Sequence, residues 1–303
     1  MNLPNPSRYF PIEKGLYEVA PGLRPLGFNF GNGERDKFVF QIDDQFLNYR
    51  ENKIACYQER ISKYFQKSNY SAKVSAAVNS FLVSQIVKEY PELFSFKNGT
   101  LQCAITEQDI RFSSDPDFLE SFCLQIQEDI AVVCGNGEKD WLAAIHLCSP
   151  SHWSAEEKVG KSFVKIHEPI PGIERIKSSA AQLVNGMITK GPWVRFVWGI
   201  DSDKRLNHHP ISPPGKNSSA WKGRSFNGTS LFIRYERQVI FGLPEVNAAL
   251  FFIRTYFIDG NEIRSNSRER DLLRSALLSM NQESLKYKGL AESRDEIILW
   301  LDN

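Results

Sequence analysis

The chain has 303 residues and is nearly neutral, with 37 basic against 36 acidic side chains and a net charge of +1. It lacks the clustered basic excess of a nucleic-acid-binding surface, so we expect no nucleic-acid partner. It also has no run of about 18 apolar residues and no apolar stretch near its start, which predicts a cytoplasmic protein with no membrane partner.

The first 95 residues are predicted to form an arm followed by two helices. Residues 1–35 are rich in proline and glycine and lack a sustained period, which is typical of a segment wrapped over a surface. Apolar residues then recur at helical spacing over 44–66 and over 71–90, where Pro91 ends the second helix. We expect these two helices to form a layer packed against a sheet.

Residues 96–260 are predicted to form the sheet core. The apolar stretches 130–134 and 141–148 flank a turn with glycines at 135 and 137, which indicates a β-hairpin. Three further strands are predicted over 193–200, 231–240 and 248–257, with a long polar loop over 201–229.

The C-terminal stretch 261–303 is predicted to close the fold with helices over 268–280 and 293–301. Antiparallel strands with inserted and appended helices favour a single α+β domain over the whole of 1–303.

Five cysteines at positions 56, 103, 123, 134 and 148 show neither a Cys-x-x-Cys pair nor a Cys-x-x-Cys-His motif. We predict free buried thiols, which leaves no motif for covalent haem attachment.

The segment 149–172 fixes one histidine, His167, in a rigid frame after a short helical turn. Pro169 pushes the residue before it away from helical backbone angles, and Pro171 fixes a further φ angle. A pre-organised imidazole suits a metal or haem iron. The alternative is an ordinary packed or solvent-facing histidine.

Two blocks of sequence resemble one known family. The first reads Pro-x-x-Trp-x-x-x-Glu-Lys-x-Gly from Pro150, followed by Ile-His-x-Pro-x-Pro around His167. The second runs from Arg234 to Tyr256, with Arg-x-Glu-Arg-Gln, Leu-Pro and Phe-x-Ile-Arg-Thr-Tyr. Their order and spacing resemble the haem-dependent oxidative N-demethylase alpha-subunit family over about 10–301. The resemblance implies a PAS-like core that binds haem and uses oxygen on a small amine.

This resemblance also implies roles for particular residues. His167 would be the proximal haem ligand, and Lys158 would neutralise a propionate. The alternative for Lys158 is an ordinary helix residue, beside a Ser154 to Glu157 capping box. Arg195 and Trp198 would line the pocket, although tryptophans are more often core residues.

The second block supplies further candidates. On a strand, Arg234 and Glu236 share one face and Arg237 lies on the other. The three are expected to give distal polarity or to anchor a propionate, with a surface ion-pair ladder as the alternative. Arg254 lies in an apolar strand, and a buried charge there requires a carboxylate or propionate partner.

One position departs from the family. The family reads Arg-x-Asn-Trp where this chain has Arg195-Phe-Val-Trp198, so Val197 replaces a polar amide. An asparagine can orient a substrate or oxygen by hydrogen bonding, whereas valine cannot. This change puts the identity of the substrate in question.

Gly-x-Gly-x-x-Gly, Walker, Gly-x-Ser-x-Gly and His-Glu-x-x-His motifs are missing from the sequence. We therefore expect electrons to come from a separate reductase carrying flavin or iron–sulfur centres. The predicted function is haem-dependent oxidative N-dealkylation, with a gas or redox sensor and a haem-free scaffold as alternatives.

Overall fold

The computed structural model describes residues 2–113, 117–224, 226, 228 and 230–303. Among these residues, the helices are too short or too polar to span a membrane.

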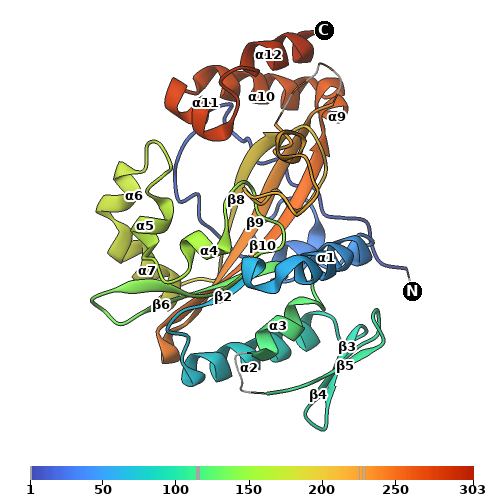
Figure 1. Cartoon of the computed structure of the whole chain (residues 1–303), viewed down its shortest axis with the longest axis vertical. Helices are drawn as coiled ribbons and strands as arrows, with labels where there is room; N and C mark the ends of the chain where they lie inside the picture. Colours follow the sequence, from blue (N-terminus) through green and yellow to red (C-terminus); the bar gives the residue numbers. More distant parts are fainter. Residues whose placement is uncertain (1, 114–116, 225, 227, 229) are drawn as a thin grey trace.

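A seven-stranded antiparallel sheet forms the centre of the molecule (Figure 1). Its strand order is β1-β8-β9-β10-β6-β7-β2. The strands are β1 (Arg24–Pro25), β2 (Phe65–Lys67), β6 (Asp129–Gly135), β7 (Asp140–His146), β8 (Trp193–Asp201), β9 (Phe232–Leu243) and β10 (Ala248–Asp259). The two short strands β1 and β2 come from the N-terminal part of the chain and lie at opposite edges. The sheet therefore ties the N-terminal part to the rest.

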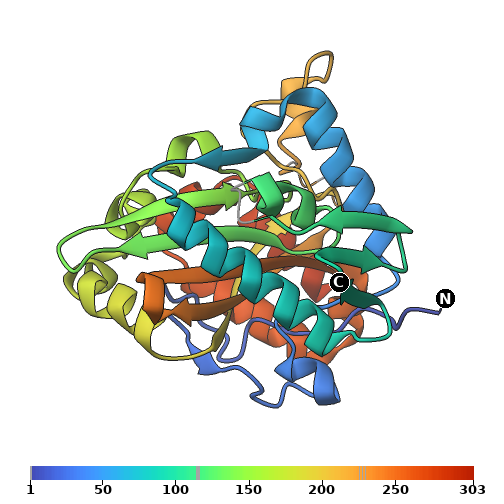
Figure 2. The same cartoon turned by 90° about the horizontal axis from the view of Figure 1, so that it is seen from below.

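Helices α1 (Phe46–Tyr64), α2 (Ala72–Glu89) and α3 (Asp117–Cys123) cover one face of the sheet. Helix α2 crosses the strands (Figure 2) and begins at Ser71, whose side chain accepts a hydrogen bond from the Val74 amide. Its apolar face buries Val78 and Leu82 against Phe252 of β10 in the largest hydrophobic core. The predicted helical layer is therefore confirmed.

A second layer of short helices covers the other face. It consists of α4 (Ala155–Lys158), α5 (Phe163–His167), α6 (Glu174–Ser178) and α7 (Ala180–Thr189). Helix α7 ends so close to β9 that a Cβ atom on Gly242 would lie 2.1 Å from the carbonyl oxygen of Ile188. Only glycine fits at this approach.

The C-terminal helices and the N-terminal arm close one end of the sheet. The helices are α9 (Gly260–Ser265), α10 (Ser267–Ser279), α11 (Gln282–Lys288) and α12 (Arg294–Asp302). Tyr9 and Ile12 of the arm are buried in the core beneath them, and Arg8 forms an ion pair with Glu269 of α10. The arm thus contributes side chains to the core. The prediction for residues 1–35 described only a segment wrapped over the surface.

The remaining elements are short. They are the small sheet β3 (Phe94–Lys97), β4 (Thr100–Cys103) and β5 (Gln108–Arg111), the helix α8 (Ser218–Trp221), and the 3-10 turns η1 (Gly33–Lys37) and η2 (Pro244–Val246).

The α+β class, the hairpin and the long strands predicted from sequence are confirmed. Helices α10 and α12 match the two predicted closing helices to within one residue at each end. The polar loop over 201–229 contains α8, and its residues 225, 227 and 229 lie outside the described part of the chain.

Candidate functional site

A cavity of about 310 Å³ lies between the sheet and the layer that contains α4 and α5. A second cavity of about 430 Å³ extends from it toward the N-terminal arm. Both volumes fall within the range of about 300–1,000 Å³ that is usual for small-molecule and cofactor sites. The residues that line both cavities are Phe163, His167, Ile170, Arg195, Val197, Trp198, Tyr287 and Lys288.

His167 is the last residue of α5 and lines both cavities. Its Nδ1 atom lies 2.7 Å from the carbonyl oxygen of Phe163. Because a carbonyl only accepts, Nδ1 is the protonated nitrogen and donates this bond. Burial lowers the pKa of His167, which favours a neutral ring with a free lone pair on Nε2. The backbone of α5 therefore fixes the tautomer of a histidine ready to bind a metal through Nε2.

The sheet wall of the cavity presents charged side chains from neighbouring strands, among them Glu236 of β9 and Arg195 of β8. Val197 of β8 pairs with Glu236 of β9, and Arg195 pairs with Gln238. Gln238 donates a 2.8 Å hydrogen bond from Nε2 to Glu236, and burial raises the pKa of Glu236. The Nε atom of Arg195 is buried without a hydrogen-bond partner, and burial lowers the pKa of Arg195. Glu236 and Arg195 can therefore each form a further hydrogen bond or ion pair with a ligand in the cavity.

Two lysines line the first cavity from opposite elements. Lys158, at the end of α4, donates a 2.7 Å hydrogen bond to the carbonyl of Ile166, and burial lowers the pKa of Lys158. Lys288, at the end of α11, donates a 2.6 Å bond to the carbonyl of Trp198. Burial lowers the pKa of Lys288 to about 8. An anionic ligand group would relieve the cost of burying both ammonium groups.

Arg234 also lines the cavity, but its guanidinium is largely engaged by the backbone. It donates to the carbonyl oxygens of Ser149, Pro150, Arg205 and Leu206 at 2.7–3.3 Å. These bonds join the segment before α4 to the start of the long loop. Arg234 thus positions the wall of the cavity.

Arg237 and Arg254 lie on the opposite face of the sheet, outside the residues that line either cavity. Arg237 donates to the carbonyl oxygens of Phe38 and Val39. Arg254 forms a 2.8 Å ion pair with the buried Asp43. The predicted carboxylate partner of Arg254 is therefore confirmed. The interpretation that placed these two arginines at the cofactor needs correction, because strand alternation turns them toward the α1 and α2 layer.

His152 lines the cavity, and it contacts residues that sequence reasoning did not select. Its Nε2 atom lies 3.0 Å from Asp201 Oδ1, and its ring stacks on that of His208. His208 lies in the polar loop predicted over 201–229, and its side chain is buried. These side chains have the composition of a metal site, but Arg234 Nε lies only 3.9 Å from Asp201 Oδ2. That positive charge disfavours a cation here.

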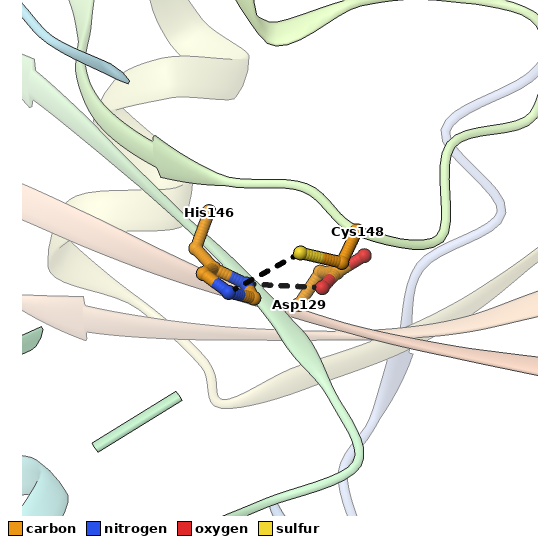
Figure 3. Close-up of side chains that lie close together, drawn as sticks. All are labelled: Asp129, His146 and Cys148. Carbon is orange, nitrogen blue, oxygen red and sulfur yellow. Dashed lines mark hydrogen bonds and ion pairs between the residues drawn. The ribbon is translucent and has the colours of Figure 1, made fainter. Parts of the chain in front are cut away.

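A separate buried triad consists of Asp129 on β6, His146 on β7 and Cys148 just after β7 (Figure 3). His146 Nδ1 lies 3.0 Å from Asp129 Oδ1, and Cys148 Sγ lies 3.5 Å from His146 Nε2. All three residues are buried, and none lines either cavity. Burial raises the pKa of Cys148 well above its usual value, so its sulfur remains a thiol. These contacts join β6 to β7 and to the residues that follow β7.

The fold and the cavity together define an α+β protein with a cofactor-sized site and one oriented imidazole donor. The chain belongs to the family described as haem-dependent oxidative N-demethylase, alpha subunit-like, which matches residues 33–298. The family's name denotes haem dependence and oxidative demethylation. The family suspected from the two sequence blocks is thereby confirmed.

Proposed function

We propose that this protein binds haem in a PAS-like α+β core and catalyses oxidative N-dealkylation of an amine. The observation that carries the proposal is His167, whose Nδ1 is fixed by the Phe163 carbonyl and whose Nε2 is left for iron. The mostly apolar walls of the cavity, which include Ile145, Ile170 and Phe251, suit a flat porphyrin.

Three cationic side chains fit the two carboxylates of a haem. Arg195 has an unpaired buried Nε atom, and Lys158 and Lys288 are buried enough for their pKa values to fall. Carboxylates placed beside these groups would stabilise their positive charges and form charge-assisted hydrogen bonds. Haem, when bound, supplies the activation of oxygen, while the protein selects and orients the substrate.

Glu236 is the candidate for binding the amine. It faces the cavity from the middle of the sheet wall and has only Gln238 as its hydrogen-bond donor among the described residues. A protonated amine beside Glu236 would pair with this carboxylate and lower its raised pKa further toward the usual value. Trp198 lines the same space and offers an aromatic face to a cationic or alkyl group. We propose that a separate reductase supplies the electrons.

Lys288 offers a test of haem placement that needs no turnover. With a pKa of about 8, roughly half of its amine is unprotonated at pH 8. We therefore expect acetic anhydride to modify Lys288 readily in the haem-free chain. We expect one equivalent of haem to protect it, because a carboxylate partner restores its charge. Peptide mass mapping measures the acetylation of Lys288 with and without haem. The exposed Lys286 of the same helix is the control, because haem should not change its acetylation. Unchanged modification of Lys288 in a chain that shows a Soret band would contradict this placement of the carboxylates.

Val197 predicts a changed substrate preference. It lines both cavities next to Glu236, so the amide of the family's asparagine is missing beside the proposed amine site. We expect dimethylamine to be a poor ligand and a larger, more apolar amine to be preferred. Val197→Asn should shift the preference toward dimethylamine by about 0.5–1.5 kcal/mol, or a factor of about 2–13 in affinity.

Haem difference spectra with amines of increasing size measure this shift. Val197→Ile serves as the control, because it changes the shape of the side chain and adds no hydrogen-bonding group. Tight binding of dimethylamine by the unmodified protein would show that Val197 does not set the preference.

A further inference from the structure

Two histidines and two aspartates form an unbroken series of contacts beside the cavity. His152 lines the cavity, and its Nε2 atom lies 3.0 Å from Asp201 Oδ1. The other oxygen of Asp201 lies 3.1 Å from His208 Nδ1. His208 Nε2 lies 2.9 Å from Asp203 Oδ1. Carboxylate and imidazole groups thus alternate along the whole series.

The series connects solvent with the cavity through the protein interior. Its outer end, Asp203, has 35% of its side chain exposed. His208 and Asp201 are buried, at 0% and 3%, and His152, at 15%, reaches the cavity. The four side chains therefore run from the partly exposed Asp203, through the buried His208 and Asp201, to His152 at the cavity.

The contacts of His208 suit proton transfer. Each ring nitrogen faces a carboxylate oxygen, so a proton that arrives at Nε2 from Asp203 can be matched by one that leaves Nδ1 for Asp201. His208 Nδ1 and Asp201 Oδ2 lie 3.1 Å apart, and neither atom makes a hydrogen bond in the described part of the chain. Each of these two atoms is therefore available to the other.

Neighbouring arginines favour the ionised carboxylates that accept these protons. Arg205 lies 2.9 Å from Asp203 Oδ2, and Arg234 Nε lies 3.9 Å from Asp201 Oδ2. Arg205 contacts Asp203 Oδ2 and leaves Oδ1 to His208. Arg234 lies near Asp201 Oδ2, the same oxygen that faces His208 Nδ1, but at the longer distance.

We propose that Asp203, His208, Asp201 and His152 form a relay that carries protons from solvent to the cavity. One proton taken up at Asp203 is balanced by one released from His152, and no residue of the relay is oxidised or reduced. The use of the relay rests on the proposed function, since reduction of oxygen consumes protons. Its existence can be tested without turnover.

The test uses Asp203→Asn in the full chain, because asparagine keeps an acceptor oxygen toward His208 but cannot take up and release a proton near neutral pH. NMR of the haem-free, ¹⁵N-histidine-labelled chain measures the exchange of the His152 Nε2 proton with water. We expect exchange to slow by about tenfold or more in Asp203→Asn, and added imidazole to restore it. The control is Asp259→Asn, at an exposed carboxylate that contacts Lys204, and it should leave the exchange unchanged.

Asp203→Glu retains a carboxylate and should keep the exchange close to that of the unmodified chain. If exchange at His152 is unchanged in Asp203→Asn, protons reach His152 from the cavity itself and the proposal is wrong. It is equally wrong if Asp203→Glu slows exchange as much as Asp203→Asn.

In the haem-loaded chain, Asp203→Asn should keep the Soret band of the unmodified protein and show a larger solvent isotope effect on turnover. If proton exchange at His152 changes as expected but the haem-loaded chain shows no turnover, the proposed function is wrong and the proton relay is still supported.

Discussion

His167→Ala is expected to abolish stoichiometric haem binding, or to shift the Soret band to that of a different ligand state. The substitution removes the Nε2 donor whose tautomer is set by the 2.7 Å bond from Nδ1 to the Phe163 carbonyl. It leaves the helix unchanged, since α5 begins at Ser162, whose side chain accepts from the Lys165 amide. Haem titration followed by absorption spectroscopy measures the loss, and circular dichroism checks the fold.

The matched control is His152→Ala. His152 also lines the first cavity, but its Nε2 atom is engaged by Asp201. We expect this variant to bind one equivalent of haem with an unaltered Soret band. Full and spectrally unchanged haem loading of His167→Ala would overturn the assignment of His167 as the axial ligand.

Among the variants proposed here, Asp43→Ala is expected to lower the free energy of unfolding most. Asp43 is fully buried and forms a 2.8 Å ion pair with Arg254, whose side chain is 1% exposed. Breaking such a pair leaves an uncompensated buried charge, which costs about 3–5 kcal/mol of the free energy of unfolding. Urea denaturation measures the change. The residues proposed to bind haem should be affected only through stability, because Asp43 and Arg254 lie on the far face of the sheet.

Glu34→Ala provides the control on an exposed ion pair. Glu34 and Lys37 are 77% and 60% exposed, and loss of such a pair costs about 0–1 kcal/mol. The double variant Asp43→Ala with Arg254→Met should recover much of the loss, since no buried charge remains. A change below about 1 kcal/mol for Asp43→Ala would show that the ion pair does not contribute as its burial implies.

The sequence predicts much of this architecture because its signals are local. Apolar spacing marks α1 and α2, and the glycines between β6 and β7 mark the hairpin. Alternation along a strand also predicted that Arg234 and Glu236 would share a face and Arg237 would not. Alternation cannot tell which face carries the cavity, because that depends on which helices cover each face. Arg237 was therefore placed at the cofactor, although it points to the other side.

The site residues that escaped prediction depend on distant contacts. Lys288 lies in a C-terminal helix and reaches the cavity only because α11 folds back to the carbonyl of Trp198. Asp201 and Asp203 resemble ordinary loop carboxylates in the sequence, and their contacts with His208 form only when the loop returns to the sheet. Arg254 was predictable in one respect, since a buried charge in an apolar strand required a partner, which is Asp43.

The central claim, oxidative N-dealkylation at the cavity beside His167, is tested most directly by release of aldehyde. The haem-loaded chain is incubated with oxygen, NADPH, a flavin-containing reductase and a series of secondary and tertiary amines, and aldehyde, amine and oxygen are quantified. We predict that aldehyde forms in step with loss of the amine, and that omission of the reductase, the haem or oxygen prevents it. A haem-loaded chain that accepts electrons yet releases no aldehyde from any amine of the series would contradict the claim and favour a sensor.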